Sequence, residues 1–162
     1  MPRLPALDAP AASDLPDGNL FATIAVRPEV CRSAARHLRA ILECGTVAHA
    51  TKALCAAMVC AVNFCEPALI AYRREARAAG VSVEMLNALW DFARSDLFTD
   101  GQKAALSTAV ALTREPRGLP DPVWGQLRAH YDDGEIVEIL ALIGMVNSLN
   151  RMSNALQTQI TR

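Results

Sequence analysis

A single cysteine within residues 63–80, which read NFCEPALIAYRREARAAG, has the setting of a reactive thiol. If a helix begins at Glu66, the Cys65 sulfur lies beside backbone N–H groups that have no partner inside that helix. The positive end of the helix dipole lowers the pKa of a thiol there and favours the nucleophilic thiolate. Pro67 suits the first turn of such a helix. The alternative is an inert, buried Cys65 that packs as a small apolar residue.

A stripe of polar side chains near the C-terminus is the second candidate. Its members lie at i, i+3, i+4 and i+7 of one predicted helix face and are Asn147, Asn150, Arg151 and Asn154. They follow the apolar run IVEILALIGMV, so those that are buried need hydrogen-bonding partners. They either line a polar pocket or form a structural network, within the chain or at a subunit contact.

The histidines and the remaining cysteines give little support for metal or acid–base chemistry. His49 lies near the start of a mostly buried predicted helix, and a structural role is favoured for it over a catalytic one. All five cysteines lie in the first half of the chain and no pair has C-x-x-C spacing, which argues against a disulfide framework and a zinc site. There is also no glycine-rich phosphate loop. We therefore expect no cofactor and no metal.

The charge balance excludes several classes of partner. The chain has 16 basic and 17 acidic residues and a net charge of −1, so it lacks the basic surface typical of proteins that bind nucleic acid or anionic membranes. The longest apolar stretch, residues 136–146, contains Glu138 and is too short to span a bilayer. The N-terminal segment has no apolar core of signal-peptide length. With free thiols as well, we expect a cytoplasmic protein.

Composition and periodicity predict an all-α protein. Hydrophobic residues make up 52% and aromatic residues only 5%, with Ala and Leu dominant, which favours helices over sheets. The 162 residues suit one domain, residues 18–162, after an extended arm rich in Pro, Asp and Ala at 1–17. The third helix is apolar almost all round and is expected at the centre. Thr99 with Gln102, and Asp132 with Glu135, have the spacing of capping boxes and predict two helix starts. The predicted helices cover residues 20–26, 28–44, 47–62, 66–79, 83–93, 99–113, 122–131 and 134–157.

From about Leu20 on, the chain resembles the alkylhydroperoxidase D-like, or carboxymuconolactone decarboxylase, family. Much of the likeness lies in FTDGQKAALSTAVALT and in LPDPVWGQLRAHYDDGEIVEILALIGMVNSLNRMSNAL, where family members have an acid-started helix that ends in an Asn-x-x-Asn-Arg-like run. The family also carries Asn-x-Cys-x-x-Cys-x-x-x-His before a helix that ends at Gly, and Asn63, Cys65 and Gly80 fall at matching spacings. The resemblance implies a bundle of about seven to eight helices that forms homo-oligomers, as a dimer, trimer or hexamer.

The chain departs from this family at the positions that carry its chemistry. In the family, one cysteine attacks a peroxide, the second resolves it as a disulfide, and a Glu and a His relay protons. Here Ala68 stands at the second cysteine and Tyr72 at the histidine, while Ala53 stands at the glutamate. Tyr72 could donate a hydrogen bond into the same pocket, but it is a poor base at neutral pH. Cys60 lies five residues upstream on a helix and is expected to point elsewhere.

These residues are compatible with three functions. The first is a thiol peroxidase that uses Cys65 alone and is resolved by an external thiol. The second is a non-redox relative whose pocket, lined by Asn63, Tyr72, His49 and the polar stripe, binds a carboxylate or a lactone or acts as a decarboxylase. Arg151 would anchor the carboxylate through its bidentate guanidinium. The third is an inactive scaffold whose role lies in oligomeric assembly.

Overall fold

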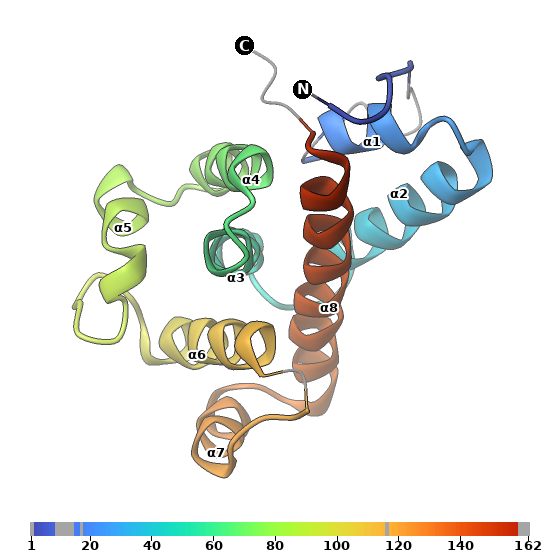
Figure 1. Cartoon of the computed structure of the whole chain (residues 1–162). Coiled ribbons are helices and arrows are strands. Elements are labelled where there is room, and N and C mark those ends of the chain that lie inside the picture. The colour runs from blue at the N-terminus through green and yellow to red at the C-terminus, as the bar shows by residue number, and fades with distance from the viewer. Residues whose placement is uncertain (1, 9–14, 17, 116, 159–162) are drawn as a thin grey trace.

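The computed structural model describes residues 2–8, 15–16, 18–115 and 117–158. Within these ranges the chain forms α-helices and one short 3₁₀ helix, and no strand (Figure 1). The predicted all-α class is therefore confirmed. The elements are α1 (Gly18–Ile24), α2 (Pro28–Glu43), α3 (His49–Val62), α4 (Glu66–Ala78), α5 (Val83–Asn87), η2 (Leu89–Asp91), α6 (Asp100–Arg114), α7 (Asp121–His130) and α8 (Asp133–Leu156).

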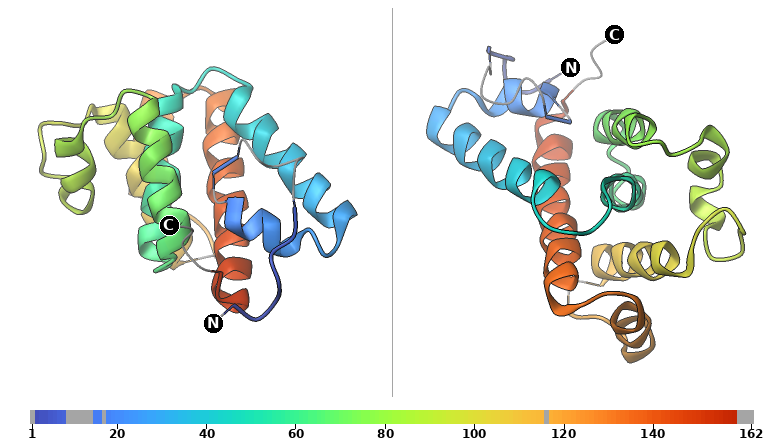
Figure 2. Two further views of the ribbon diagram at one scale, coloured as in Figure 1. Left: turned by 90° about the horizontal axis from the view of Figure 1, so that it is seen from above. Right: turned by 180° about the vertical axis from the view of Figure 1, so that it is seen from behind.

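Helix α3 is the centre of the molecule, as its apolar sequence predicts. Every residue from 51 to 61 is buried, and α4, α6 and α8 pack around it. The long helix α8 runs between the α1–α2 pair on one side and the group of α3, α4, α5 and α6 on the other (Figures 1 and 2). The C-terminal end of α3 leads through a short turn into α4.

By length and mean hydropathy, α8 alone among the described helices could cross a membrane. Half of its most apolar stretch is buried against the rest of the chain. That is the burial expected of a core helix in a folded domain, where one face packs and the other is solvated.

The predicted helix starts are present in detail. The hydroxyl of Thr99 accepts the N–H of Gln102 at 3.2 Å, and the Gln102 side chain accepts the N–H of Thr99 at 3.0 Å. Asp132 and Glu135 form the same reciprocal capping box at the start of α8. Each cap stabilises its helix by about 1 kcal/mol.

The fifth helix is shorter than predicted. It ends at Asn87, and η2 follows, instead of one helix that continues to residue 93. Both Leu86 and Leu89 are buried, whereas Trp90 is 58% exposed. Residues three apart eclipse in a 3₁₀ turn, so the tighter winding keeps both leucines on the buried side.

The N-terminal arm contacts the helical body where the structure describes it. The N–H of Arg3 donates to the carbonyl of Leu156 at 3.0 Å, and the N–H of Leu7 donates to the carbonyl of Ala22 at 2.8 Å. The side chain of Leu15 is buried in the core. Residues 1, 9–14 and 17 of the arm lie outside the described part, and the boundary between the arm and the domain stays a prediction.

Candidate functional site

The turn between α3 and α4 returns the chain to the end of α3. Phe64 has a left-handed backbone with a φ of 53°. Its N–H donates to the carbonyl of Ala61 at 3.2 Å, and the N–H of Cys65 donates to the carbonyl of Cys60 at 3.0 Å. This pair of bonds is the Schellman motif, which satisfies the last carbonyls of a helix. Glycine is usual at the left-handed position, but here Phe64 occupies it with its side chain 89% exposed.

Cys65 ends this turn and is also the N-cap of α4. Pro67 lies in the first turn of α4, as the sequence predicts. The carbonyl of Cys65 accepts the N–H of Leu69 at 2.9 Å, the first hydrogen bond of the helix. The thiol therefore lies at the positive end of a 13-residue helix, which favours a thiolate. Cys65 is 0% exposed, although Phe64 and Glu66 beside it are both exposed.

Asparagine side chains tie this turn to α8. Nδ2 of Asn63 donates to Oδ1 of Asn147 at 2.9 Å, and Nδ2 of Asn147 donates to Oγ1 of Thr113 at 3.0 Å. Nδ2 of Asn154 donates to the backbone carbonyl of Asn63 at 3.0 Å. The C-terminal ends of α3 and α6 are thus joined to α8 by one polar network, with Asn147 buried at its centre.

Asn150 lies on the same helix but contacts Cys60. Sγ of Cys60 lies 3.5 Å from Oδ1 of Asn150 and donates a weak hydrogen bond to it. Both residues are completely buried. Nδ2 of Asn150 has no hydrogen-bond partner among the residues that the structure describes. A buried amide donor without an acceptor costs about 1–3 kcal/mol, so its presence here needs a reason.

Of the remaining predicted site residues, one lies at the far end of α3 and one is exposed on α8. His49 is the first residue of α3, whereas Asn63 caps the opposite end, about 20 Å away along a helix of this length. The imidazole of His49 is half exposed and pairs with Glu75 of α4, with 2.5 Å between Nε2 and Oε1. Arg151 is exposed. The structure brings Asn63 and Asn147 to the Cys65 turn, and it leaves His49 at the far end of the bundle.

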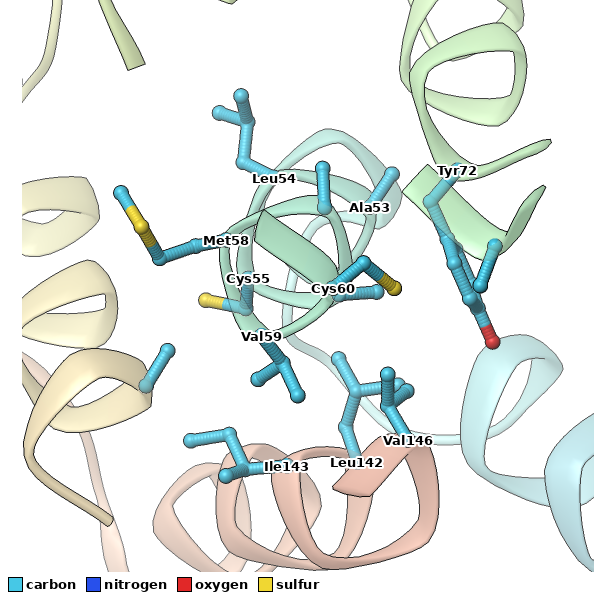
Figure 3. Close-up of a cluster of buried hydrophobic side chains, with 14 of the residues drawn as sticks. Ala53, Leu54, Cys55, Met58, Val59, Cys60, Tyr72, Leu142, Ile143 and Val146 are labelled. Atoms are coloured by element: carbon cyan, nitrogen blue, oxygen red, sulfur yellow. The ribbon is translucent and has the colours of Figure 1, made fainter. Parts of the chain in front are cut away.

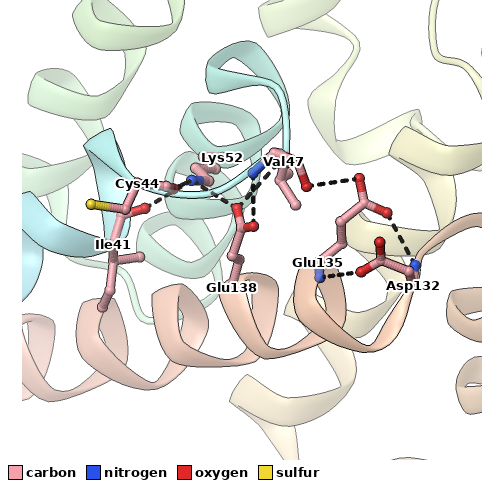
Figure 4. Close-up of polar contacts among 8 residues, drawn as sticks. Ile41, Cys44, Val47, Lys52, Asp132, Glu135 and Glu138 are labelled. Carbon is pink, nitrogen blue, oxygen red and sulfur yellow. Dashed lines mark hydrogen bonds and ion pairs between the residues drawn. The ribbon is translucent and has the colours of Figure 1, made fainter.

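A buried lysine lies near that far end and was not among the predicted site residues. Lys52 is 2% exposed, and its Nζ donates to the carbonyl of Ile41 at 2.9 Å and to that of Cys44 at 2.6 Å. It also pairs with Glu138 of α8 at 3.0 Å (Figure 4). Lys52 therefore caps the C-terminal end of α2 and links it to α8. One sequence signal was available, because both residues are isolated charges inside otherwise apolar runs.

Glu138 is held from two sides. Its carboxylate accepts the N–H of Thr46 at 2.8 Å and the N–H of Val47 at 3.1 Å, in addition to the Lys52 ammonium. Burial alone would raise the pKa of Glu138, but these hydrogen bonds and the charge of Lys52 outweigh it and lower the pKa. Gly45 packs directly against this carboxylate with a φ of 90°. These contacts hold the α2–α3 loop in place, which is a structural role.

The other thiols have settings that differ from that of Cys65. Burial raises the pKa of Cys55 to about 12, so this thiol stays protonated at neutral pH. Sγ of Cys31 lies 3.6 Å from the carbonyl of Phe21 and donates to it. Cys44 is exposed at the end of α2.

An open groove of about 460 Å³ lies between α2 and α8. Its lining is mainly apolar and includes Val30, Ala34, Met145, Leu149 and Met152. Cys65 does not line it. Within the described part of the chain, no three His, Cys, Asp or Glu side chains are grouped in a way that could hold a metal ion.

Comparison with known proteins identifies relatives by sequence and by structure. No family model matches the chain. The uncharacterized protein YdfG of Bacillus subtilis is 28% identical over 107 residues, which cover 65% of this chain and 73% of that protein. The uncharacterized protein YnjA of Escherichia coli is 33% identical over 100 residues, which cover 62% of this chain and 53% of that protein. The second match thus spans about half of the E. coli protein.

Solved structures identify the fold. A protein of unknown function from Agrobacterium tumefaciens, proposed to be the antioxidant defence protein AhpD, superposes with a TM-score of 0.81 at 26% identity, over 86% of this chain and 96% of that chain. The fold is therefore alkylhydroperoxidase D-like. The debrominase Bmp8, solved with a cysteine-to-alanine substitution and 2,3,4-tribromopyrrole, shares this fold with a TM-score of 0.84 at 21% identity, over 96% of this chain and 90% of that chain.

This chain has buried, packed side chains at the positions where the alkylhydroperoxidase D-like motif has reactive groups. Ala68 and Tyr72 are each 1% exposed and lie on the buried face of α4. Ala53 is 0% exposed, and it lies with Cys60 on the side of α3 that faces Tyr72 (Figure 3). The methyl groups of the alanines cannot resolve a sulfenic acid or carry a proton. Any thiol chemistry at Cys65 must therefore use other groups.

Proposed function

We propose that the protein is a thiol-dependent oxidoreductase that reduces hydroperoxides through Cys65. The observation that supports this most is the position of Cys65, at the N-cap of α4 and next to the exposed Phe64. The helix dipole favours the thiolate, which is the form that attacks a peroxide. One protein of the same fold has been proposed to be an antioxidant defence protein.

The proposed reaction has two stages. The Cys65 thiolate attacks one oxygen of the hydroperoxide, the O–O bond breaks, and the other oxygen leaves as an alcohol after it takes up a proton. Cys65 is then a sulfenic acid. Two equivalents of an external thiol return it to the thiol and yield one disulfide and one water. Since Cys65 is 0% exposed, the turn at Phe64 must open for a peroxide to enter.

Peroxide consumption by matched variants tests this function. Wild type and Cys55→Ser should consume tert-butyl hydroperoxide in the presence of a dithiol, whereas Cys65→Ser should fall to the background rate. Cys55 is a suitable control because it is equally buried on the same helix bundle and its pKa is raised to about 12. Equal rates in wild type and Cys65→Ser would contradict the proposal.

A second candidate acceptor is a halogenated aromatic compound. The debrominase Bmp8 has the same fold, and a variant that lacks one cysteine was solved with 2,3,4-tribromopyrrole. For the present protein, a dithiol would supply the two electrons that replacement of bromine by hydrogen requires. Bromide release from 2,3,4-tribromopyrrole in the presence of a dithiol, by wild type but not by Cys65→Ser, would support this acceptor in place of a peroxide.

The proposed function also includes an oligomeric state and a cellular location. We propose a homo-oligomer in a reducing cytoplasm, with an external dithiol as the electron donor. The apolar groove between α2 and α8, with Val30 52% exposed, is a surface that a second subunit would cover. Multi-angle light scattering tests the oligomer, and a monomer at all concentrations would contradict it.

A further inference from the structure

We infer that Cys60 is the resolving partner of Cys65, so that oxidation of the site ends in a Cys60–Cys65 disulfide. This inference rests on the proposed function, because it needs Cys65 to react with a peroxide first. It assigns to this chain a cysteine pair with five-residue spacing, in place of the C-x-x-C pair that the chain lacks.

The backbone geometry of the turn brings the two residues together. In a continuous helix, Cys60 and Cys65 would point in different directions, as the sequence predicts. Here α3 ends before Cys65, and the chain reverses at Phe64. The N–H of Cys65 lies 3.0 Å from the carbonyl oxygen of Cys60. Standard bond lengths then keep the two Cα atoms within about 7 Å of each other. Disulfides join Cα atoms about 4.4–6.8 Å apart, and side chains at these two Schellman positions commonly touch.

Asn150 supplies the second, independent observation. It is 0% exposed, its Oδ1 accepts from Sγ of Cys60, and its Nδ2 has no partner among the described residues. When Cys60 gives up its proton, the bond to Oδ1 is lost and the sulfur needs a donor. A rotation of the Asn150 amide about its terminal torsion brings Nδ2 to the thiolate. The unpaired donor is thus placed to stabilise the sulfur that attacks the sulfenic acid.

The redox balance is complete with a hydroperoxide as the oxidant. Cys65 takes one oxygen atom from the hydroperoxide and releases an alcohol. Sγ of Cys60 then attacks Sγ of Cys65, the S–O bond breaks, and the oxygen leaves as water with the proton of Cys60. The pair has lost two electrons and two hydrogen atoms, and the peroxide has gained them. A dithiol of the solvent later reduces the disulfide by exchange.

No other cysteine fits this role as well. The sulfur of Cys55 points away from Tyr72, whereas the sulfur of Cys60 points toward it (Figure 3). Cys31 is engaged with the carbonyl of Phe21. Cys44 is exposed at the end of α2, on the opposite end of α3 from Cys65, and is removed in the test protein.

The test uses full-length Cys44→Ser protein, reduced and then treated with one equivalent of tert-butyl hydroperoxide. Free thiols are alkylated under denaturing conditions, and the peptides are mapped by mass spectrometry without reduction. The expected product is a cross-linked Cys60–Cys65 peptide that has lost two hydrogen atoms. In Cys60→Ala the cross-link should be absent and Cys65 should accumulate as a sulfenic acid that dimedone traps. Cys55→Ala is the matched control and should keep the cross-link.

The outcomes separate this inference from the proposed function. If Cys65 is oxidised but Cys60 keeps its thiol in the protein that contains both, the inference is overturned and the function stands. If Cys65 is not oxidised, both are overturned. Asn150→Ala adds a readout that folding alone does not move. This substitution should shift the pH midpoint of the cross-linking rate upward. An unchanged midpoint together with an unchanged rate would show that Asn150 takes no part in the reaction.

Discussion

The backbone N–H of Cys65 donates to the carbonyl of Cys60 at 3.0 Å, and this bond closes the turn that ends α3. The two residues are five positions apart in the sequence, and the turn at Phe64 brings their backbones back into contact. The same turn makes Cys65 the N-cap of α4. One hydrogen-bonded turn therefore sets both the electrostatic setting of the proposed nucleophile and the position of its proposed partner.

Replacement of Phe64 tests whether the turn is strained. Its left-handed backbone costs a non-glycine residue about 1–2 kcal/mol, and its side chain is 89% exposed, so little packing is lost on removal. We expect Phe64→Gly to raise the free energy of unfolding by about 1 kcal/mol after the greater chain entropy of glycine is subtracted. Phe64→Ala keeps the strain and should leave the stability nearly unchanged in urea denaturation. Equal effects of the two changes would show that the backbone is not strained.

Loss of one partner of the Lys52–Glu138 pair should be severe. Glu138→Gln leaves the ammonium of Lys52, which is 2% exposed, without a counter-charge. We expect a loss of about 3 kcal/mol in the free energy of unfolding. The exposed pair of Arg32 and Glu29 is the control, and Glu29→Gln should cost less than about 1 kcal/mol. Similar losses in the two variants would mean that the buried pair contributes no more than a surface one.

The same carboxylate predicts a pH dependence. The pKa of Glu138 is lowered in the folded protein, so folding favours its ionised form. Its contribution to stability is complete above its ordinary pKa of 4.5 and is lost as the pH falls through the lower folded value. The stability difference between wild type and Glu138→Gln should therefore be constant near neutral pH and shrink in acid. Urea denaturation over a pH series measures it, and a difference that stays constant into acid would contradict the assignment.

Gly45 and Gly144 give opposite predictions for the same substitution. A Cβ at Gly45 would meet the Glu138 carboxylate, and the φ of 90° is strained for alanine. Gly45→Ala should lower the free energy of unfolding by at least about 2 kcal/mol. Gly144 lies inside α8 with open space around it, so Gly144→Ala should raise stability by about 0.5–1 kcal/mol. Thermal melts of both variants measure the two changes in stability. A stabilised Gly45→Ala would show that the loop can move away from the Glu138 carboxylate.

Local signals in the sequence predicted most of the fold. The capping boxes at Thr99 and Asp132 set two helix starts, and the apolar sequence of α3 placed it at the centre. These features depend on residues a few positions apart. The site depends on longer-range packing. The contact of Asn150 with Cys60 joins α8 to α3, and no spacing within one helix reveals it. The sequence also carries no signal of the chain reversal at Phe64, because glycine is the usual residue at that left-handed position.

The central claim is that Cys65 is the working thiol, and a single-turnover measurement tests it most directly. Reduced wild-type and Cys44→Ser proteins are each mixed with one equivalent of tert-butyl hydroperoxide, and the alcohol formed and the Cys65 thiol that remains are both quantified. We predict one equivalent of alcohol and loss of the free Cys65 thiol in both proteins. Full retention of the Cys65 thiol, with the peroxide unchanged or consumed only when Cys44 is present, would contradict it.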